Sequence, residues 1–280
     1  MFKQEFMKII TNISFYLAII ATIVLLLAST FYVVPDTGKE YTLFDIIFGV
    51  ADDKVVTESG LVSEEIIIKG INSHYYEMFL PLVTVIPFIV GIYGDKKNSI
   101  TRFQIYRTGK LRYTLGKFMA VLVSGGLITM LGQMIFSLII YSIFPHGESE
   151  MFELNKMILF EESDFCRVLV DRIGIMGLYI LKFFRVFLYG AFSTVIAFAL
   201  SIVIKNRYMV LTIPVVIEYI WEKFIYKSMD AKMYTLLPSS VGNVFHTDIS
   251  WMLPFFITIV VVSIVFYMVC LERKCDCGEE

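Results

Sequence analysis

Charged side chains are scarce in this sequence. Lys, Arg, Asp and Glu make up 18% of its 280 residues, whereas hydrophobic residues make up 57% and the mean hydropathy is +0.73. Soluble domains carry about 25% charged residues. Apolar runs of about 18 or more residues recur, and each is long enough to cross a hydrocarbon core about 30 Å thick. The composition therefore excludes an ordinary soluble protein and indicates a polytopic membrane protein without a sizeable soluble domain.

Cysteine is also rare, and the four cysteines do not follow the pattern of a disulfide framework. Cys166 is isolated, while Cys270, Cys275 and Cys277 cluster near the end of the sequence. A structural zinc site needs four ligands, and no fourth ligand stands near this cluster. We therefore expect no metal site and interpret the cysteine-containing end as a reduced cytosolic segment.

A nucleotide-binding loop of the form G-x-x-x-x-G-K-[ST] is absent. The stretch "RTGKL" supplies Gly109 and Lys110, but Gln104 and Leu111 occupy the other defining positions. We therefore expect this chain to bind no cofactor and to hydrolyse no ATP by that device. Nucleic acid is not an expected partner either, and the net charge of −2 gives no indication of one.

Six segments are apolar enough to cross a membrane, and we expect α-helices for all of them. No series of short alternating strands occurs, and unpaired backbone groups cannot face lipid. The second segment is short and contains Pro81 and Pro87. The expected fold class is an all-α polytopic membrane protein, with one transmembrane domain over residues 1–280. The expected spans cover residues 15–34, 78–94, 118–144, 187–204, 208–226 and 251–271.

The distribution of Lys and Arg predicts the orientation, because basic loops stay in the cytoplasm. The loop at 95–117 contains seven basic residues and one acid, and the turn at 205–207 is also basic. The loop at 35–77 contains nine acids and three lysines, and the loop at 145–173 contains seven acids, so both are expected outside. Six spans then place both termini in the cytoplasm of a multi-pass protein of a bacterial cell membrane.

Residues 1–14 are expected to form a helix on the inner membrane surface. Apolar side chains at Phe2, Phe6, Ile9 or Ile10, and Ile13 follow helical spacing, with polar residues between them. A frayed cytoplasmic tail is the alternative.

The residues before the fourth span are apolar but carry cations. Two cations in the middle of a bilayer are costly. We therefore expect Lys182 and Arg185 to extend to the outer interface, with the span starting near Phe187 or earlier. An external amphipathic helix is then expected to precede the span.

The fifth expected span carries two acids, Glu218 and Glu222, on one helical face. Glu218 lies roughly 15 Å along this helix from Tyr208, at about 1.5 Å per residue. An acid at that depth faces a bundle interior or a water-filled cavity, and Pro214 can kink the helix one turn earlier. Either the two acids line or gate a translocation path, or they are structural and pair with a neighbouring Arg, Lys or backbone group. For Glu222, a position at the outer boundary beside Lys223 is a further alternative.

The stretch "EEIIIKG", Glu64–Gly70, resembles the EExxxR element of CAAX-type intramembrane proteases. Such an enzyme uses paired carboxylates and His to activate water, usually with a metal. Here Lys69 replaces the Arg, the carboxylates lie in an expected external loop, and the partner FxxxH element is absent. This intramembrane protease stays an alternative, as does a non-transporting membrane sensor or assembly protein.

The basic stretch at 95–117 has an ordered pattern that orientation alone does not require. Asn98 or Ser99 can cap a helix and Gly109 can end it. This short helix is expected to present an apolar and cationic face to anionic lipid or to a protein partner. The residues expected on or beside that face are Ser99, Ile100, Arg102, Phe103, Tyr106 and Arg107.

This layout resembles the permease subunit of ABC-2-type transporters. The shared features are an interfacial N-terminal helix, six spans and an amphipathic segment between the second and third spans. The stretch "YRTGKLRYTLGKF" looks like the family pattern in which a small polar turn precedes a Tyr and then a Lys that enters the third span, here Tyr113 and Lys117. The resemblance covers essentially the whole chain in layout, whereas the large acidic first loop is less typical.

The resemblance implies that residues 98–108 dock in a groove of a separate ATPase subunit, which would hold ATP and Mg²⁺. It also implies that two permease subunits, identical or homologous, pair in the lipid membrane and that the second and fifth spans contribute to their interface and path. The expected function is therefore an ATP-driven exporter subunit. A peptide or an amphiphilic antimicrobial compound is the expected substrate class.

Overall fold

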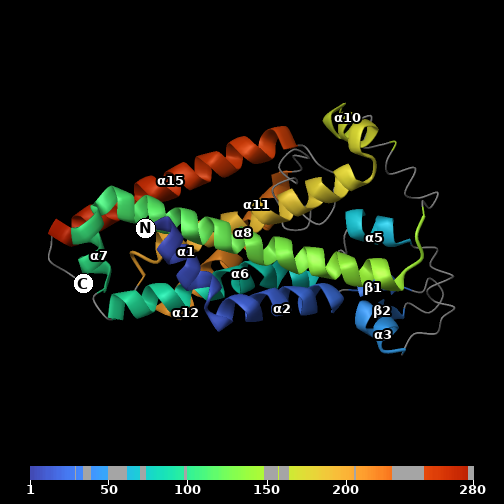
Figure 1. The fold of residues 1–280 in the computed structure, drawn as a ribbon, viewed down its shortest axis with the longest axis horizontal. Helices are drawn as coiled ribbons and strands as arrows, with labels where there is room; N and C mark the ends of the chain where they lie inside the picture. Colours follow the sequence, from blue (N-terminus) through green and yellow to red (C-terminus); the bar gives the residue numbers. More distant parts are fainter. Residues whose placement is uncertain are drawn as a thin grey trace.

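Long helices dominate the computed structural model, which describes residues 1–28, 30–33, 39–49, 62–69, 74–97, 100–147, 157, 164–204, 206–228 and 249–276 (Figure 1). The long helices are α2 (Ile13–Leu27), α6 (His74–Lys97), α8 (Lys110–Ile143), α11 (Met176–Leu200), α12 (Arg207–Ser228) and α15 (Ile249–Asp276). Each expected span overlaps one of them. The shorter helices are α1 (Phe2–Ile10), α3 (Leu43–Ile47), α5 (Ser63–Lys69), α7 (Ile100–Thr108) and α10 (Asp164–Ile173).

The described helices support a membrane protein but do not all qualify as spans. By length and composition α8 and α11 can each cross a membrane, and α1 with α2 qualifies as a pair bent by 61°. The apolar segments of α6, α12 and α15 are shorter and cover 79–95, 207–217 and 256–272. A helical membrane protein is therefore supported, whereas the number of six spans stays a prediction.

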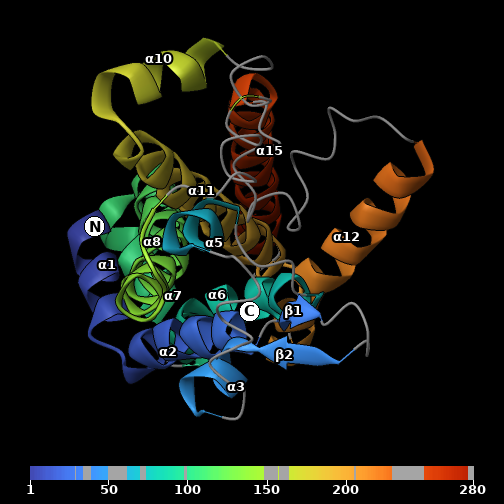
Figure 2. The ribbon, with the colours of Figure 1, turned by 90° about the vertical axis from the view of Figure 1, so that its right-hand side faces the viewer.

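The centre of the bundle is an unusually close contact between the antiparallel helices α8 and α11 (Figure 2). A Cβ atom added to Gly125 would lie 2.3 Å from the Thr194 side chain, and one added to Gly190 would lie 2.4 Å from the Thr129 hydroxyl. Each helix thus places a glycine against the threonine of the other. Such small residues let two helix backbones approach closely, which favours packing where water does not drive helices together.

Local sequence explains the two breaks at the end of the bundle where α1 and α7 lie. The Asn12 side chain accepts a hydrogen bond from the backbone N–H of Ser14 at 3.0 Å and so caps α2 where it turns away from α1. Gly109 separates α7 from α8 with a φ of 81°, a conformation that favours glycine. The predicted helix ending at Gly109 is confirmed.

The first expected span ends too late in the prediction. Helix α2 stops at Leu27, and residues that belong to the expected span form strand β1 (Thr30–Val33), which pairs antiparallel with β2 (Glu40–Thr42). The β1 residues are β-branched and aromatic, which suits a strand. A small two-stranded sheet is therefore added to the expected all-α fold.

Helix α3 follows this sheet and is held by a capping box. The Thr42 N–H donates to the Asp45 carboxylate at 2.8 Å, and the Thr42 hydroxyl accepts from the Asp45 N–H. The Thr42 backbone bond, followed by the hydroxyl bond, lowers the pKa of Asp45 below its ordinary value. The acidic loop therefore contains ordered structure beside the outer end of the bundle, by the predicted orientation.

The helices at the third and fourth expected spans, α8 and α11, begin earlier than predicted. Helix α8 runs without interruption from Lys110, so the second half of the expected 95–117 loop is helical. Helix α11 starts at Met176, and the expected amphipathic helix before it is present as α10.

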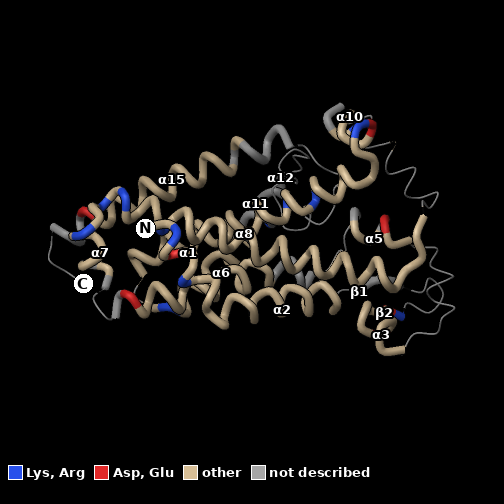
Figure 3. The backbone as a smooth tube through the Cα atoms, viewed as in Figure 1, with Lys and Arg blue, Asp and Glu red and all other residues tan. Residues whose placement is uncertain are grey.

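The prediction that the Lys182 and Arg185 side chains reach water at the outer interface is wrong. Both side chains are buried, each with 1% of its surface exposed. Helix α11 starts at Met176, before both residues, and the side of the helix that carries them packs against neighbouring helices. Figure 3 shows that charge otherwise gathers toward the ends of the described helices.

Candidate functional site

Helix α7 lies at one end of the bundle, near the N-terminus and the end of α15 (Figure 1). Phe103 and Tyr106 are exposed over 81% and 93% of their surfaces, and Arg107 is also exposed. Ile105, by contrast, packs partly buried against the main hydrophobic core. The predicted outward face is therefore present for these residues. Ile100 and Arg102 lie in α7 but their side chains are outside the described set, as is the whole of Ser99.

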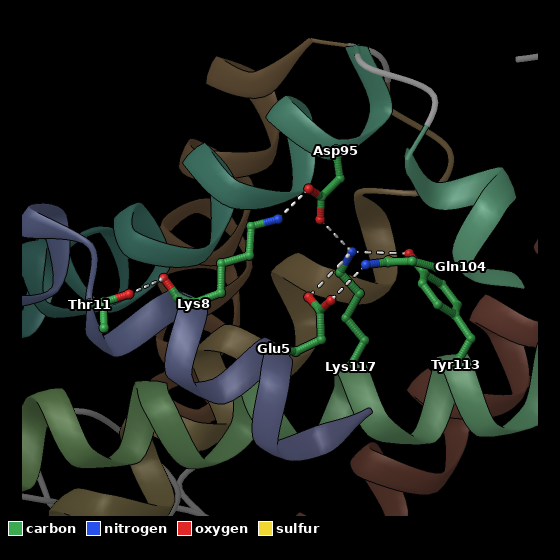
Figure 4. Close-up of polar contacts among 7 residues, drawn as sticks. All are labelled: Glu5, Lys8, Thr11, Asp95, Gln104, Tyr113 and Lys117. Atoms are coloured by element: carbon green, nitrogen blue, oxygen red, sulfur yellow. Dashed lines mark hydrogen bonds and ion pairs between the residues drawn. The ribbon is translucent and has the colours of Figure 1, made fainter. Parts of the chain in front are cut away.

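Behind α7, the ammonium group of Lys117 is the centre of a buried polar cluster (Figure 4). Its Nζ atom donates to the Tyr113 hydroxyl at 3.0 Å and to Asp95 Oδ2 at 3.1 Å, and it lies 3.8 Å from Glu5 Oε2. The Lys117 and Asp95 side chains are each 4% exposed and that of Glu5 is 6% exposed. Ionised groups this deeply buried need such partners, because burial removes their hydration.

Two further contacts connect this cluster to other helices. The Lys8 ammonium group donates to Asp95 Oδ1, and Gln104 Nε2 donates to Glu5 Oε1 at 3.1 Å. The ionic cluster, defined as Glu5, Lys8, Asp95, Gln104, Tyr113 and Lys117, therefore joins α1, α6, α7 and α8. It contains two ammonium groups and two carboxylates, so its formal charges balance.

The position of Lys117 explains why the cluster can be charged in a membrane protein. Helix α8 has 34 residues and is about 51 Å long, about 20 Å more than a hydrocarbon core. Lys117 lies only about 10 Å from the start of this helix. A group this close to the start of so long a helix can lie outside the hydrocarbon core, and a small cavity of about 40 Å³ between α1, α6 and α8 adjoins the cluster.

An aromatic group lies directly behind the ionic cluster. The centroid of the Phe118 ring lies 4.6 Å from that of Phe198 in α11 and 5.7 Å from that of Tyr267 in α15, both edge to face. The Phe198 and Tyr267 rings stack with their centroids 4.7 Å apart. All three side chains are buried. Because Phe118 follows Lys117 in sequence, one turn of α8 connects the ionic cluster to the packed helices α11 and α15.

Some members of this cluster are noticeable in the sequence. Asp95, the one acid of the basic stretch, and Tyr113 and Lys117 of the family-like pattern all stand out, but nothing in sequence pairs them. Glu5 was missed as a functional residue. Its signal is its position, since it lies four residues before Ile9, about one helical turn away, on the side of α1 that the structure buries.

Glu218 and Glu222 belong to α12, as the prediction of a fifth helix requires. Figure 2 shows α12 diverging from the other long helices. Glu218 occupies the helix position one turn beyond the buried Pro214. The side chains of both acids lie outside the described set, so their role in a path stays a prediction.

At the opposite end of the bundle, α5 is linked to the segment that follows α8. The buried Ser63 hydroxyl donates to Glu64 Oε2 at 2.8 Å and lies 2.9 Å from His146 Nδ1. The same Glu64 oxygen accepts from the Gly147 N–H at 3.1 Å. These contacts bring together a carboxylate and a histidine that the protease alternative would need. The Glu65 side chain, its paired carboxylate, is outside the described set.

Among the described residues no group of three or more His, Cys, Asp or Glu side chains is arranged to hold a metal ion. Cys166 is buried and Cys270 half-buried, and neither forms a disulfide bond, while Cys277 lies outside the described residues. The main candidate site is therefore the ionic cluster beneath the exposed helix α7.

Comparisons with models of protein families, with curated proteins and with solved structures find no match for this chain.

Proposed function

We propose that this chain is the membrane-spanning permease subunit of an ATP-driven exporter of the ABC-2 type. It forms a translocation path together with a second permease subunit and is driven by separate ATPase subunits that hold ATP and Mg²⁺. A peptide or an amphiphilic antimicrobial compound is the proposed substrate class. The observation that carries this proposal is α7, a helix exposed on one side and bonded to the ionic cluster on the other.

The exposed side of α7 has the chemistry of a protein-binding surface. Large aromatic residues and arginine dominate the energetics of protein interfaces, and Phe103, Tyr106 and Arg107 stand side by side with no described neighbour covering them. Exposed apolar groups rimmed by charge are typical of docking sites. A groove with acidic edges on an ATPase subunit would cover the rings and pair with the cations.

The inner side of α7 offers a route for mechanical coupling. The Gln104 side chain donates a hydrogen bond to Glu5 of the ionic cluster. In the same cluster Lys117 bonds to Asp95, which belongs to α6, the helix that contains two prolines. A displacement of α7 would therefore act on α1, α6 and α8 together. This arrangement supports coupling between an ATPase and the helices of a path.

Replacing both exposed aromatics tests the docking surface. We expect Phe103→Ala/Tyr106→Ala to weaken binding of the ATPase encoded in the same operon by roughly 30-fold or more, because each ring is a candidate hot spot. Binding is measured on the full-length proteins in detergent. The matched control is Phe48→Ala, which removes a ring 74% exposed at the other end of the bundle.

A wild-type chain that binds no ATPase would contradict the proposal and favour the sensor or assembly protein. Equal binding by the double variant and the Phe48→Ala control would show that α7 is not the docking helix.

Glu218 tests the path. We expect Glu218→Gln to reduce substrate transport or substrate-stimulated ATP hydrolysis by about tenfold, with assembly unchanged, since an ionised acid within a path acts on the substrate and not on the ATPase contact. Transport by reconstituted complexes is compared with that of Glu272→Gln, an exposed acid of α15. Unchanged transport would instead assign Glu218 a structural role.

A further inference from the structure

We propose that α1 and the first turns of α8 form a binding site for an anionic phospholipid. The two helices meet where the start of α1 packs on Gly116, since a Cβ atom there would lie 2.9 Å from the Met1 side chain and 3.3 Å from the Phe2 nitrogen. The surface around this contact is called the lipid corner below. It is defined by Phe2, Lys3, Met7, Leu111, Arg112, Leu115 and Met119. The proposal does not depend on the transport function.

The outward side of α1 exposes apolar side chains beside its lysines, as a helix on a membrane surface does. Phe2 and Met7 are exposed over 41% and 50% of their surfaces, and Ile13, just beyond the helix, over 72%. The acid Glu5, in contrast, is buried. Apolar residues also lie on the inner side, where Ile9 is buried, so apolar side chains are found on both sides of α1. Because α1 also bends 61° from α2, it suits a position across the membrane surface.

Helix α8 continues this apolar surface toward the hydrocarbon. Leu111, Leu115 and Met119 are exposed and recur every four residues, so they form one stripe along the helix. The stripe starts beside α7 and runs past Gly116, where α1 begins. This stripe is an apolar surface beside the start of α1 along which an acyl chain can lie.

The charges at the lipid corner select an anionic headgroup. Lys3 and Arg112 are both exposed there. The only acid in residues 1–20 or 100–119 is Glu5, which is buried within the ionic cluster. The exposed charges of these two segments are thus all positive, and Arg can bind a phosphate through two parallel hydrogen bonds. A choline headgroup adds a cation that these residues would repel, whereas a glycerol headgroup does not.

The test measures lipid retention by the full-length protein in detergent. Phosphatidylglycerol and phosphatidylcholine with identical acyl chains are titrated, and bound lipid is counted by native mass spectrometry. We expect preferential binding of phosphatidylglycerol, and about 25-fold weaker binding of it by Lys3→Gln/Arg112→Gln, at about fivefold for each cation near an anionic surface. Leu115→Gln is expected to weaken retention of both lipids.

The matched control is Arg172→Gln/Arg207→Gln, which removes two exposed cations outside the lipid corner. An equal loss in this control would overturn the site in favour of general charge attraction. Equal retention of the two lipids by the wild type would also overturn it. So would displacement of phosphatidylglycerol by soluble glycerol phosphate, because the acyl stripe would then be irrelevant.

Discussion

Gly190→Ala is expected to destabilise the protein strongly. The new methyl carbon would lie 2.4 Å from the Thr129 hydroxyl and 2.6 Å from the carbonyl oxygen of Gly125. A side chain can rotate away, but a backbone oxygen in the centre of α8 can yield only if the two helices separate. Overpacking of this kind costs about 1–3 kcal/mol, and here we expect the upper end of that range.

The consequence reaches beyond the two glycines, because the whole α8–α11 interface depends on their close approach. The Thr129 hydroxyl lies 2.9 Å from the carbonyl oxygen of Val186 on α11, a contact that is lost when the helices move apart. We therefore expect the thermal unfolding midpoint in detergent to fall by roughly 5–10 °C. Gly190→Leu is expected to prevent accumulation of folded protein.

The control is Gly94→Ala in α6, where an added Cβ atom meets nothing within 4 Å. In a helix this change removes a flexible residue and is expected to be neutral or slightly stabilising. Fluorescence-detected size exclusion after heating compares the two variants. If Gly190→Ala is as stable as Gly94→Ala, the close approach of α8 and α11 is refuted.

Lys117→Met is expected to cost about 3–5 kcal/mol, since it leaves the buried carboxylates of Glu5 and Asp95 with too few counter-charges. Lys8 still contacts Asp95, but its side chain is 45% exposed and cannot replace a cation at the centre of the ionic cluster. The loss should exceed that of Arg172→Met, an exposed cation for which we expect less than about 0.5 kcal/mol.

A double-mutant cycle isolates the contact between Lys117 and Asp95. Asp95→Asn alone removes one carboxylate, and the combination Asp95→Asn/Lys117→Met removes both charges of the pair. We expect the double variant to be more stable than the sum of the two losses predicts, by about 1–3 kcal/mol. Strict additivity of the unfolding free energies would show that the two side chains do not interact.

The same variants distinguish stability from coupling under the proposed function. Gln104 connects α7 to Glu5 without itself carrying charge, so Gln104→Leu breaks one hydrogen bond and leaves the four charges in place. In complexes with the ATPase, it is a milder probe of the link between α7 and the bundle than Lys117→Met. Intact binding with reduced transport is the pattern that coupling requires.

Much of the helical layout could be predicted because its causes are local. Hydrophobic runs place a helix near each of the six expected spans, and Gly109 ends α7 because it adopts a positive φ. The ends of helices were less predictable. The β-branched and aromatic residues of β1 are as apolar as a helix interior, so hydropathy alone extends the first span through them.

The ionic cluster and the α8–α11 contact could not be predicted, because both depend on how separate helices rotate against each other. Glu5 and Lys117 are far apart in sequence, and the spacing of each along its own helix says nothing of the partner. The same holds for the burial of Lys182 and Arg185, which hydropathy and charge rules assign to an interface.

The sequence was sufficient to predict a helical membrane protein and the approximate positions of its long helices. It also predicted a short helix with an aromatic and cationic face between the second and third expected spans. Composition and residue periodicity are properties of a single segment, so a helix can be predicted from that segment alone. Tertiary packing was needed to establish which charges meet behind that helix, which glycines face which threonines, and which cations are buried. These features arise from the rotation and register of packed helices, and side-chain contacts across helices, not local propensity, determine both.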